Sequence, residues 1–184
     1  MRSPDDVIQQ IIQIAEEDDR VRAVLLNGSR ADPNAPRDIF QDFDIVYLVD
    51  EIEPFVANPG WITRFGETLI VQTPETMNEP PPSRDGTFIY LMLFADGNRI
   101  DLTLCPVRIY EAQKPESLTL VLLEKDLRLG ALPPASDADY VPVPPSAKRF
   151  ADCCNEFYWV STNAGKGLWR TVWASRTRRA RPTT

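Results

Sequence analysis

The feature that most constrains this chain is a pair of strand-like segments joined by a two-residue turn. Residues 88–94 (FIYLMLF) are continuously apolar, and residues 99–105 (RIDLTLC) alternate apolar side chains with polar ones such as Asp101. The dipeptide Asp96-Gly97 between them favours the tight turn of a hairpin. The sequence therefore predicts a β-hairpin, and with it an antiparallel part of a sheet.

Segments before the hairpin predict helices and further strands. Apolar side chains recur with helical spacing behind Ser3, a capping residue, so we expect a helix that ends near Asp19. Short apolar runs bounded by turn residues predict strands at 21–26, 43–49 and 67–72 and a short helix at 61–65. These elements predict an α/β (α+β) fold, a mixed and mostly antiparallel sheet flanked by helices.

The C-terminal part of the chain differs from this pattern. Residues 131–145 are rich in proline and predict an extended connection, after which a helix begins near Ala147. We therefore divide the chain into a first domain at 1–145, a helix at 146–173 and a disordered tail at 174–184. The helix has more large apolar side chains than a solitary helix buries, which favours a missing helical domain or a homodimer.

The composition excludes several classes of site. The 184 residues contain no histidine and only three cysteines, so catalytic triads with histidine, disulfide frameworks and thiolate–imidazole zinc sites are not expected. A cytoplasmic location fits these cysteines best. No apolar run is long enough to span a membrane, and the first residues do not resemble an export signal, so we expect no membrane partner.

The charge is distributed unevenly along the chain. Residues 1–169 have a net charge of −12, whereas five arginines lie in the last fifteen positions. Such an acidic body repels nucleic acid and attracts small polycations. We therefore expect a cationic small molecule, and no nucleic acid, as the partner.

Three aspartates form the main candidate site. Asp42 and Asp44 are two residues apart at the start of a strand, so their side chains share one face, about 6–7 Å apart. If the strand that contains Asp101 lies beside them, the third carboxylate comes within ~4.5–7 Å. Such charges repel by roughly 2–4 kcal/mol per pair at an effective dielectric near 20. A divalent cation such as Mg²⁺ would offset this repulsion.

The tripeptide Gly28-Ser29-Arg30 follows the first predicted strand. Glycine lets the backbone approach a phosphate, and the serine hydroxyl and the guanidinium can both donate to phosphate oxygens. A phosphate-binding turn beside paired carboxylates is what phosphoryl or nucleotidyl transfer requires.

These motifs resemble a known family. The runs 26–31 (LNGSRA) and 40–45 (FQDFDI) are similar to the Gly-Ser and Asp-x-Asp signature of polymerase-β-like nucleotidyltransferases. More closely, they resemble the aminoglycoside 6-adenylyltransferases, which modify streptomycin, and the likeness continues through 90–94, 99–104 and 152–157. It covers nearly all of residues 1–173.

The resemblance implies an activity and roles for individual residues. It implies a Mg²⁺-dependent transfer of AMP from ATP to a hydroxyl of an aminoglycoside, which confers antibiotic resistance. Asp42, Asp44 and Asp101 would be the catalytic metal ligands, and Gly28, Ser29 and Arg30 would hold the triphosphate. For Lys166, phosphate contact and ordinary helix-surface charge are both open.

The length departs from the family's pattern. Family members have a helical C-terminal domain that closes the aminoglycoside site, and this sequence contains only the first helix or so, followed by an Arg-rich tail. Two alternatives to a complete enzyme therefore stay open. In the first alternative the chain is a truncated, nucleotide-binding remnant without turnover, and in the second it is a subunit whose partner supplies the helices.

Overall fold

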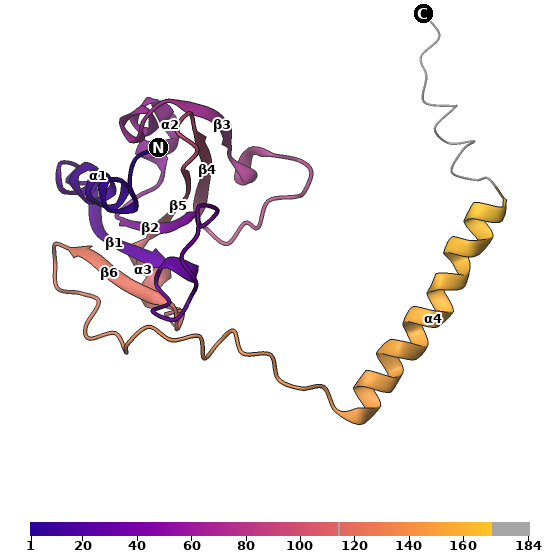
Figure 1. Cartoon of the computed structure of the whole chain (residues 1–184). Helices are drawn as coiled ribbons and strands as arrows, with labels where there is room; N and C mark the ends of the chain where they lie inside the picture. Colours follow the sequence, from indigo (N-terminus) through magenta and orange to yellow (C-terminus); the bar gives the residue numbers. More distant parts are fainter. Residues whose placement is uncertain (114, 171–184) are drawn as a thin grey trace, which may run out of the picture. The chain divides into compact units, whose positions relative to one another are not determined.

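The computed structural model of the chain describes residues 1–113 and 115–170. The chain separates into two compact units, residues 1–140 and 141–184. The first contains every strand of the described residues, and the second contains one long helix (Figure 1).

A single six-stranded sheet forms the centre of the first unit. Its strands are β1 (Val21–Asn27), β2 (Phe43–Val49), β3 (Thr68–Gln72), β4 (Phe88–Phe94), β5 (Arg99–Pro106) and β6 (Thr119–Glu124), in the order β3-β4-β5-β2-β1-β6. Only β2 and β5 are parallel. The predicted mixed, mostly antiparallel sheet is therefore confirmed, and β2 lies in the interior of the sheet, between β5 and β1.

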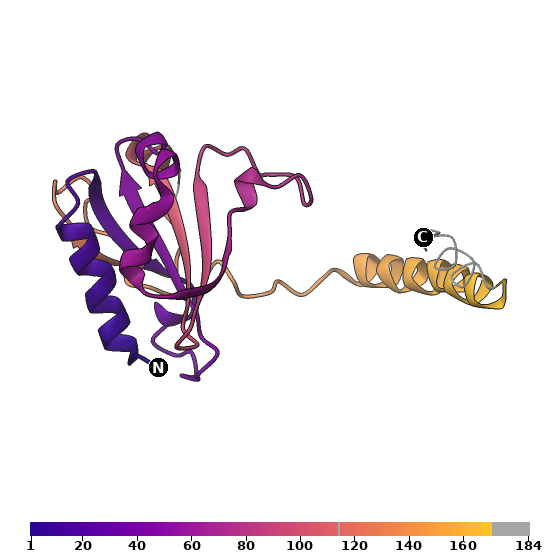
Figure 2. The same ribbon diagram turned by 90° about the horizontal axis from the view of Figure 1, so that it is seen from above.

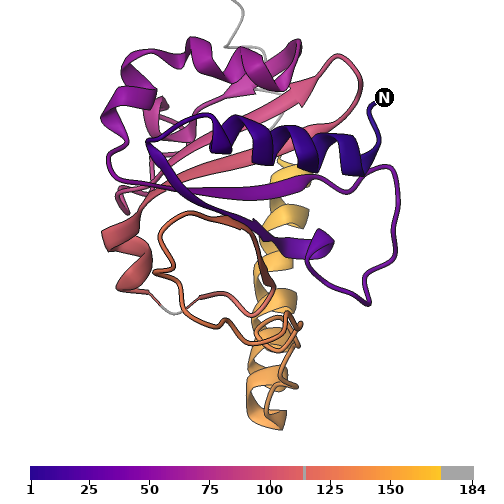
Figure 3. The same ribbon diagram turned by 90° about the vertical axis from the view of Figure 1, so that its left-hand side faces the viewer.

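Helices cover one face of the sheet (Figures 2 and 3). These are α1 (Pro4–Glu16), the short α2 (Glu53–Ala57) and the 3₁₀ segment η2 (Pro59–Phe65). Ser3 caps α1 in a reciprocal capping box with Asp6, which satisfies amides at the helix start. Alternate residues of the strands, among them Tyr47 and Tyr90, are buried in one core beneath these helices.

The opposite face of the sheet is only partly covered. The short helix α3 (Val107–Glu111) packs Val107 against Leu25 and Leu48 in a second, smaller core. Short 3₁₀ turns follow β1 (η1, Gly28–Arg30) and β3 (η3, Pro74–Thr76). Near the starts of β2 and β5, the side chains that point to this face are polar, and they include Asp44 and Asp101.

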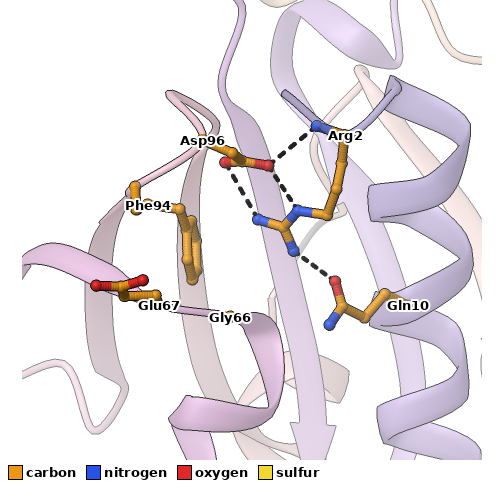
Figure 4. Close-up of a pocket in the computed structure, with 7 residues that line it drawn as sticks. Arg2, Gln10, Gly66, Glu67, Phe94 and Asp96 are labelled. Atoms are coloured by element: carbon orange, nitrogen blue, oxygen red, sulfur yellow. Dashed lines mark hydrogen bonds and ion pairs between the residues drawn. The ribbon is translucent and has the colours of Figure 1, made fainter.

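The start of the chain is tied to the β4–β5 hairpin by Arg2 (Figure 4). The Arg2 Nε donates to Asp96 Oδ2 at 2.7 Å, its backbone N–H donates to the same oxygen at 3.0 Å, and its guanidinium lies 5.1 Å from the ring centroid of Phe94. Gln10 of α1 accepts a further hydrogen bond from Arg2. These contacts join α1 to the hairpin turn.

The second unit contains α4 (Ala147–Trp169), which begins at the predicted residue and is capped by Ser146. Its large apolar side chains are exposed, including Phe157, Trp159 and Trp169. None of the helices in the described residues is long and apolar enough to cross a membrane. The predicted tail at 174–184, and the end of the predicted helix at 171–173, lie outside the described residues.

The sequence pattern missed several short elements. The helices α2 and α3, each of five residues, and the edge strand β6 were not predicted, and α1 ends at Glu16, three residues before the expected position. Five residues make less than two helical turns, so α2 and α3 show no clear period and depend on contacts with the rest of the fold. The edge strand β6 takes its register from pairing with β1.

Candidate functional site

Three polar side chains form a row across the sheet. Asp44 of β2 pairs in register with Asn27 of β1 on one side and with Asp101 of β5 on the other. Residues that pair directly across strands place their side chains on the same face. The parallel pairing of β2 with β5 therefore sets the carboxylates of Asp44 and Asp101 side by side, on the partly covered face.

Asp42 completes a cluster of three carboxylates. It immediately precedes β2, and one carboxylate oxygen from each of Asp42, Asp44 and Asp101 lies within 4.8 Å of the others. The structure thus brings together the three acids that the sequence analysis selected. Converging carboxylate oxygens, none of them fully buried, are the donors that a hard divalent cation such as Mg²⁺ prefers. The donor set fits such an ion.

The charges of this cluster are not balanced. The pKa of Asp44 is raised to about 6, first because the side chain is partly buried and then because Asp42 and Asp101 are close. Glu116 adds to this rise, whereas Arg99 opposes it. A carboxyl that resists ionisation for these reasons is typical of a site that binds a cation.

Gly28 is required beside Asp44 for two reasons. Its φ of 69° lies in the left-handed region, which side chains other than glycine rarely adopt. In addition, a Cβ at this position would overlap the Asp44 carboxylate. Glycine therefore lets the turn after β1 come directly against the acidic cluster, as a phosphate-binding turn beside a metal site would require.

Arg30 uses part of its guanidinium to bond to backbone carbonyls. Its Nε donates to the carbonyl of Asp42 at 2.7 Å and its Nη2 donates to the carbonyl of Gln41 at 2.6 Å, while the guanidinium stacks on Phe43, 3.8 Å from the ring centroid. Arg30 therefore holds the segment that positions Asp42. Its predicted contact with the triphosphate would have to use its remaining N–H groups.

Ser29 lies between the turn and this segment. Its hydroxyl oxygen accepts a hydrogen bond from Gln41 Nε2 at 3.3 Å. The oxygen of that amide, Gln41 Oε1, is buried and has no hydrogen-bond partner among the residues that the structure describes. The hydroxyl hydrogen of Ser29 can still be donated, so its predicted phosphate contact is compatible with this geometry.

Arg99 contacts the acidic cluster, a role that the sequence analysis did not predict. Its Nε and Nη2 donate to the two oxygens of Asp101 at 2.8 and 2.5 Å, and its Nη1 lies 3.8 Å from Asp42 Oδ2. Arg99 is two residues before Asp101 on one strand, so the side chains share a face. That spacing was the available signal.

A cavity of about 430 Å³ adjoins the cluster on the same face. Asp44 and Asp101 form part of its lining, together with two residues that were not predicted, Glu116 and Tyr140. The Tyr140 hydroxyl donates to Glu116 Oε2 at 3.0 Å. Among the described residues, three carboxylates and no basic side chain line this cavity, so it suits a cationic ligand.

Lys166 is the one predicted site residue outside the first unit. It lies in the last turn of α4. Its contribution to phosphate binding therefore stays a prediction.

Comparisons with known proteins agree on one family. A family profile described as Streptomycin adenylyltransferase matches residues 1–178. An aminoglycoside 6-adenylyltransferase from Bacillus subtilis is 42% identical over 172 residues, and one from Staphylococcus aureus is 34% identical over 172 residues. The chain is also similar to the crystal structure of an aminoglycoside 6-adenyltransferase from Bacillus subtilis, with a TM-score of 0.59 and 38% identity.

The matches cover this chain more fully than they cover the relatives. They include 92% of this chain but 61% of each of those two curated proteins. The structural match covers 93% of this chain and 59% of the solved structure. The chain thus spans about three fifths of the length of these relatives.

Proposed function

The chain belongs to the family of streptomycin adenylyltransferases, and on that premise we propose that it transfers AMP from Mg·ATP to a hydroxyl of an aminoglycoside such as streptomycin. The observation that carries this proposal is the convergence of Asp42, Asp44 and Asp101 beside Gly28. That arrangement pairs a divalent-cation site with a turn that a phosphate can approach closely.

The reaction needs one bond to form and one to break. The acceptor hydroxyl oxygen bonds to the α-phosphorus of ATP, the bond from that phosphorus to the β-phosphate oxygen breaks, and pyrophosphate leaves. A divalent cation held by the three aspartates would neutralise charge on the phosphates and orient them. The sequence contains no histidine, and we propose that a carboxylate takes the hydroxyl proton. Asp101 is one candidate for this base, and a group in a helical domain or partner is equally a candidate.

The chain's own residues would orient the nucleotide. Ser29 and Arg30, in the turn after β1, have hydroxyl and guanidinium hydrogens that can be donated to phosphate oxygens. Gly28 has no side chain, so this turn can lie directly against Asp44. By holding the carbonyls of Gln41 and Asp42, Arg30 also fixes the position of the first metal-binding carboxylate.

The acidic cavity supports a cationic acceptor. Its lining places Glu116 on the same face as Asp44 and Asp101, so an ammonium or guanidinium group of the acceptor would meet a carboxylate while a hydroxyl reaches the cluster. ATP and three free cysteines both fit a reducing cytoplasm, which we propose as the location.

The proposal is tested by incubating the purified chain with Mg·ATP and streptomycin and measuring pyrophosphate release. We expect release that requires both substrates and falls by roughly 100-fold or more in Asp44→Asn, since a lost metal ligand weakens charge neutralisation in the transition state. Asp126→Asn is the matched control, because Asp126 pairs with Arg22 away from the cluster and the change should leave the rate unchanged.

Binding measurements distinguish the complete enzyme from a nucleotide-binding module and from a subunit that needs a partner. Mg·ATP binding without pyrophosphate release would favour a nucleotide-binding module, or a subunit that needs a helical partner. Equal Mg·ATP affinity in Asp44→Asn and in the unaltered chain would show that the three aspartates are not the metal site.

A further inference from the structure

The guanidinium of Arg99 lies against the acidic cluster. It bonds to both oxygens of Asp101 in a bidentate arrangement and also lies beside Asp42. It makes no other hydrogen bond or ion pair with residues that the structure describes. Within the described part of the chain, every hydrogen bond and ion pair of this side chain is therefore with a proposed metal ligand.

These contacts leave Arg99 free to move. Its side chain is 50% exposed, so solvent weakens the ion pair, and rotation about side-chain bonds would remove the guanidinium without moving β5. Three carboxylates converge here, and the guanidinium of Arg99 and the more distant one of Arg30 supply two positive charges, so an excess of negative charge remains. Arg99 therefore balances the cluster only in part.

A divalent cation and Arg99 would compete for the same oxygens. Both oxygens of Asp101 already accept from the guanidinium, and an ion bound to Asp101 and Asp42 would place a double positive charge directly beside it. Like charges at this distance repel strongly. The ion pair and the occupied metal site therefore oppose each other.

We propose that Arg99 is an exchangeable counter-ion of the acidic cluster, which a divalent cation displaces from Asp101 and which then binds a phosphate of the incoming nucleotide. This inference rests on the proposed function, because it takes the three aspartates as the metal site. A planar guanidinium binds two phosphate oxygens as readily as two carboxylate oxygens. Arg99 would thus be a positioning residue whose partner changes from an aspartate to the nucleotide.

A permanent brace is the opposing interpretation. Arginine can hold a carboxylate in position from behind while that carboxylate binds a metal. In that case the bonds between Arg99 and Asp101 would persist with the ion in place.

The first experiment follows the Arg99 side chain directly by NMR of its Nε–H group in the full chain. We expect its signal to shift, and its hydrogen to exchange faster with water, as Mg²⁺ saturates the site, and protection to return when pyrophosphate is added. Arg22, whose Nε donates to Asp126 at 2.6 Å, is the internal reference that should not change. An Arg99 signal that stays protected at saturating Mg²⁺ would overturn the proposal in favour of a brace.

The second experiment measures affinities. In Arg99→Gln we expect Mn²⁺ alone to bind about threefold to tenfold more tightly, and a non-hydrolysable ATP analogue with Mg²⁺ to bind about tenfold more weakly. Arg99→Lys keeps the charge but loses the bidentate geometry, so it should lie between. Arg22→Gln is the matched control and should change neither affinity. Unchanged analogue affinity in Arg99→Gln would exclude the phosphate contact.

Asp44→Asn separates this inference from the proposed function. If that variant loses Mn²⁺ binding while the Arg99 signal of the unaltered chain ignores Mg²⁺, the metal site stands and only the exchange is wrong. If Asp44→Asn binds Mn²⁺ as the unaltered chain does, the metal site and the exchange both fail.

Discussion

The β4–β5 hairpin contributes to two acidic sites, a single aspartate in its turn and the three-aspartate cluster, and the negative charges of these sites are balanced differently. In the turn, Asp96 accepts hydrogen bonds from the guanidinium and the backbone N–H of Arg2 (Figure 4). It also accepts one from the side chain of Asn98. A few residues along β5, Asp101 and the nearby Asp42 contact the guanidinium of Arg99, and Asp44 lies beside both of them. One group is matched with its counter-charge, and the other has an excess of acids.

The pKa values of the two groups move in opposite directions. The Arg2 guanidinium, more than any other group, holds the pKa of Asp96 well below its ordinary range. Burial and two neighbouring acids raise the pKa of Asp44 to about 6. Ionised Asp96 therefore stabilises the fold at neutral pH, whereas ionised Asp44 destabilises it. In this comparison the candidate site is distinguished by carboxylates that exceed their positively charged partners.

Asp96→Asn should have the largest effect on stability. The change removes the partner of a partly buried arginine, and we expect a loss of about 2–3 kcal/mol in the free energy of unfolding at pH 7. Because the folded pKa of Asp96 is depressed, its contribution is present above about pH 4 and declines as the pH falls further. Urea unfolding at pH 7 and pH 3 measures both. A loss under ~0.5 kcal/mol at pH 7 would remove the contrast.

Asp44→Asn should have the opposite sign and a smaller size. The shift to about 6 amounts to nearly 3 kcal/mol at full value, and solvent screening reduces our expectation to about 2 kcal/mol of added stability at pH 8 without divalent cations. The raised pKa means that the folded unaltered chain binds the extra proton between about pH 4 and pH 6, so its stability falls as pH rises through that window.

The pH dependence is the check on this second prediction. The advantage of Asp44→Asn should be nearly absent at pH 4, where both the folded and the unfolded Asp44 hold much of their proton, and complete by pH 8. Thermal or urea unfolding in chelator-treated buffer at the two pH values gives the difference. A variant that is less stable at pH 8 would mean that Asp44 is satisfied in the fold as Asp96 is.

Local sequence rules predicted much of the fold and of the acidic cluster. The Asp96-Gly97 turn fixes the hairpin, and the two-residue period of a strand places Asp101 on the face opposite Ile100. The same period puts Asp42 and Asp44 together. The sequence pattern did not predict that β2 and β5 pair in parallel, because this pairing depends on contacts between residues far apart in the chain.

Long-range contacts also explain what was missed. Glu116 reaches the cavity through the segment before β6, a strand whose register comes from pairing with β1. The position of Arg30 shortly after Gly28 predicts a phosphate ligand. In the structure, two of its N–H groups donate to backbone carbonyls eleven and twelve residues later in the chain. A local motif gives the chemistry of a side chain but not all of its partners.

Glu17→Gln should have the smallest effect and sharpens the comparison from the other side. Glu17 pairs with Arg64, as Asp96 pairs with Arg2, but its side chain is 52% exposed and follows the last turn of α1, where negative charge is unfavourable. We expect a change within about 0.5 kcal/mol in urea unfolding at pH 7. A loss as large as that of Asp96→Asn would mean that any ion pair stabilises this fold. The stabilising effect of the pair between Asp96 and Arg2 could then not be attributed to its partial burial and its several hydrogen bonds.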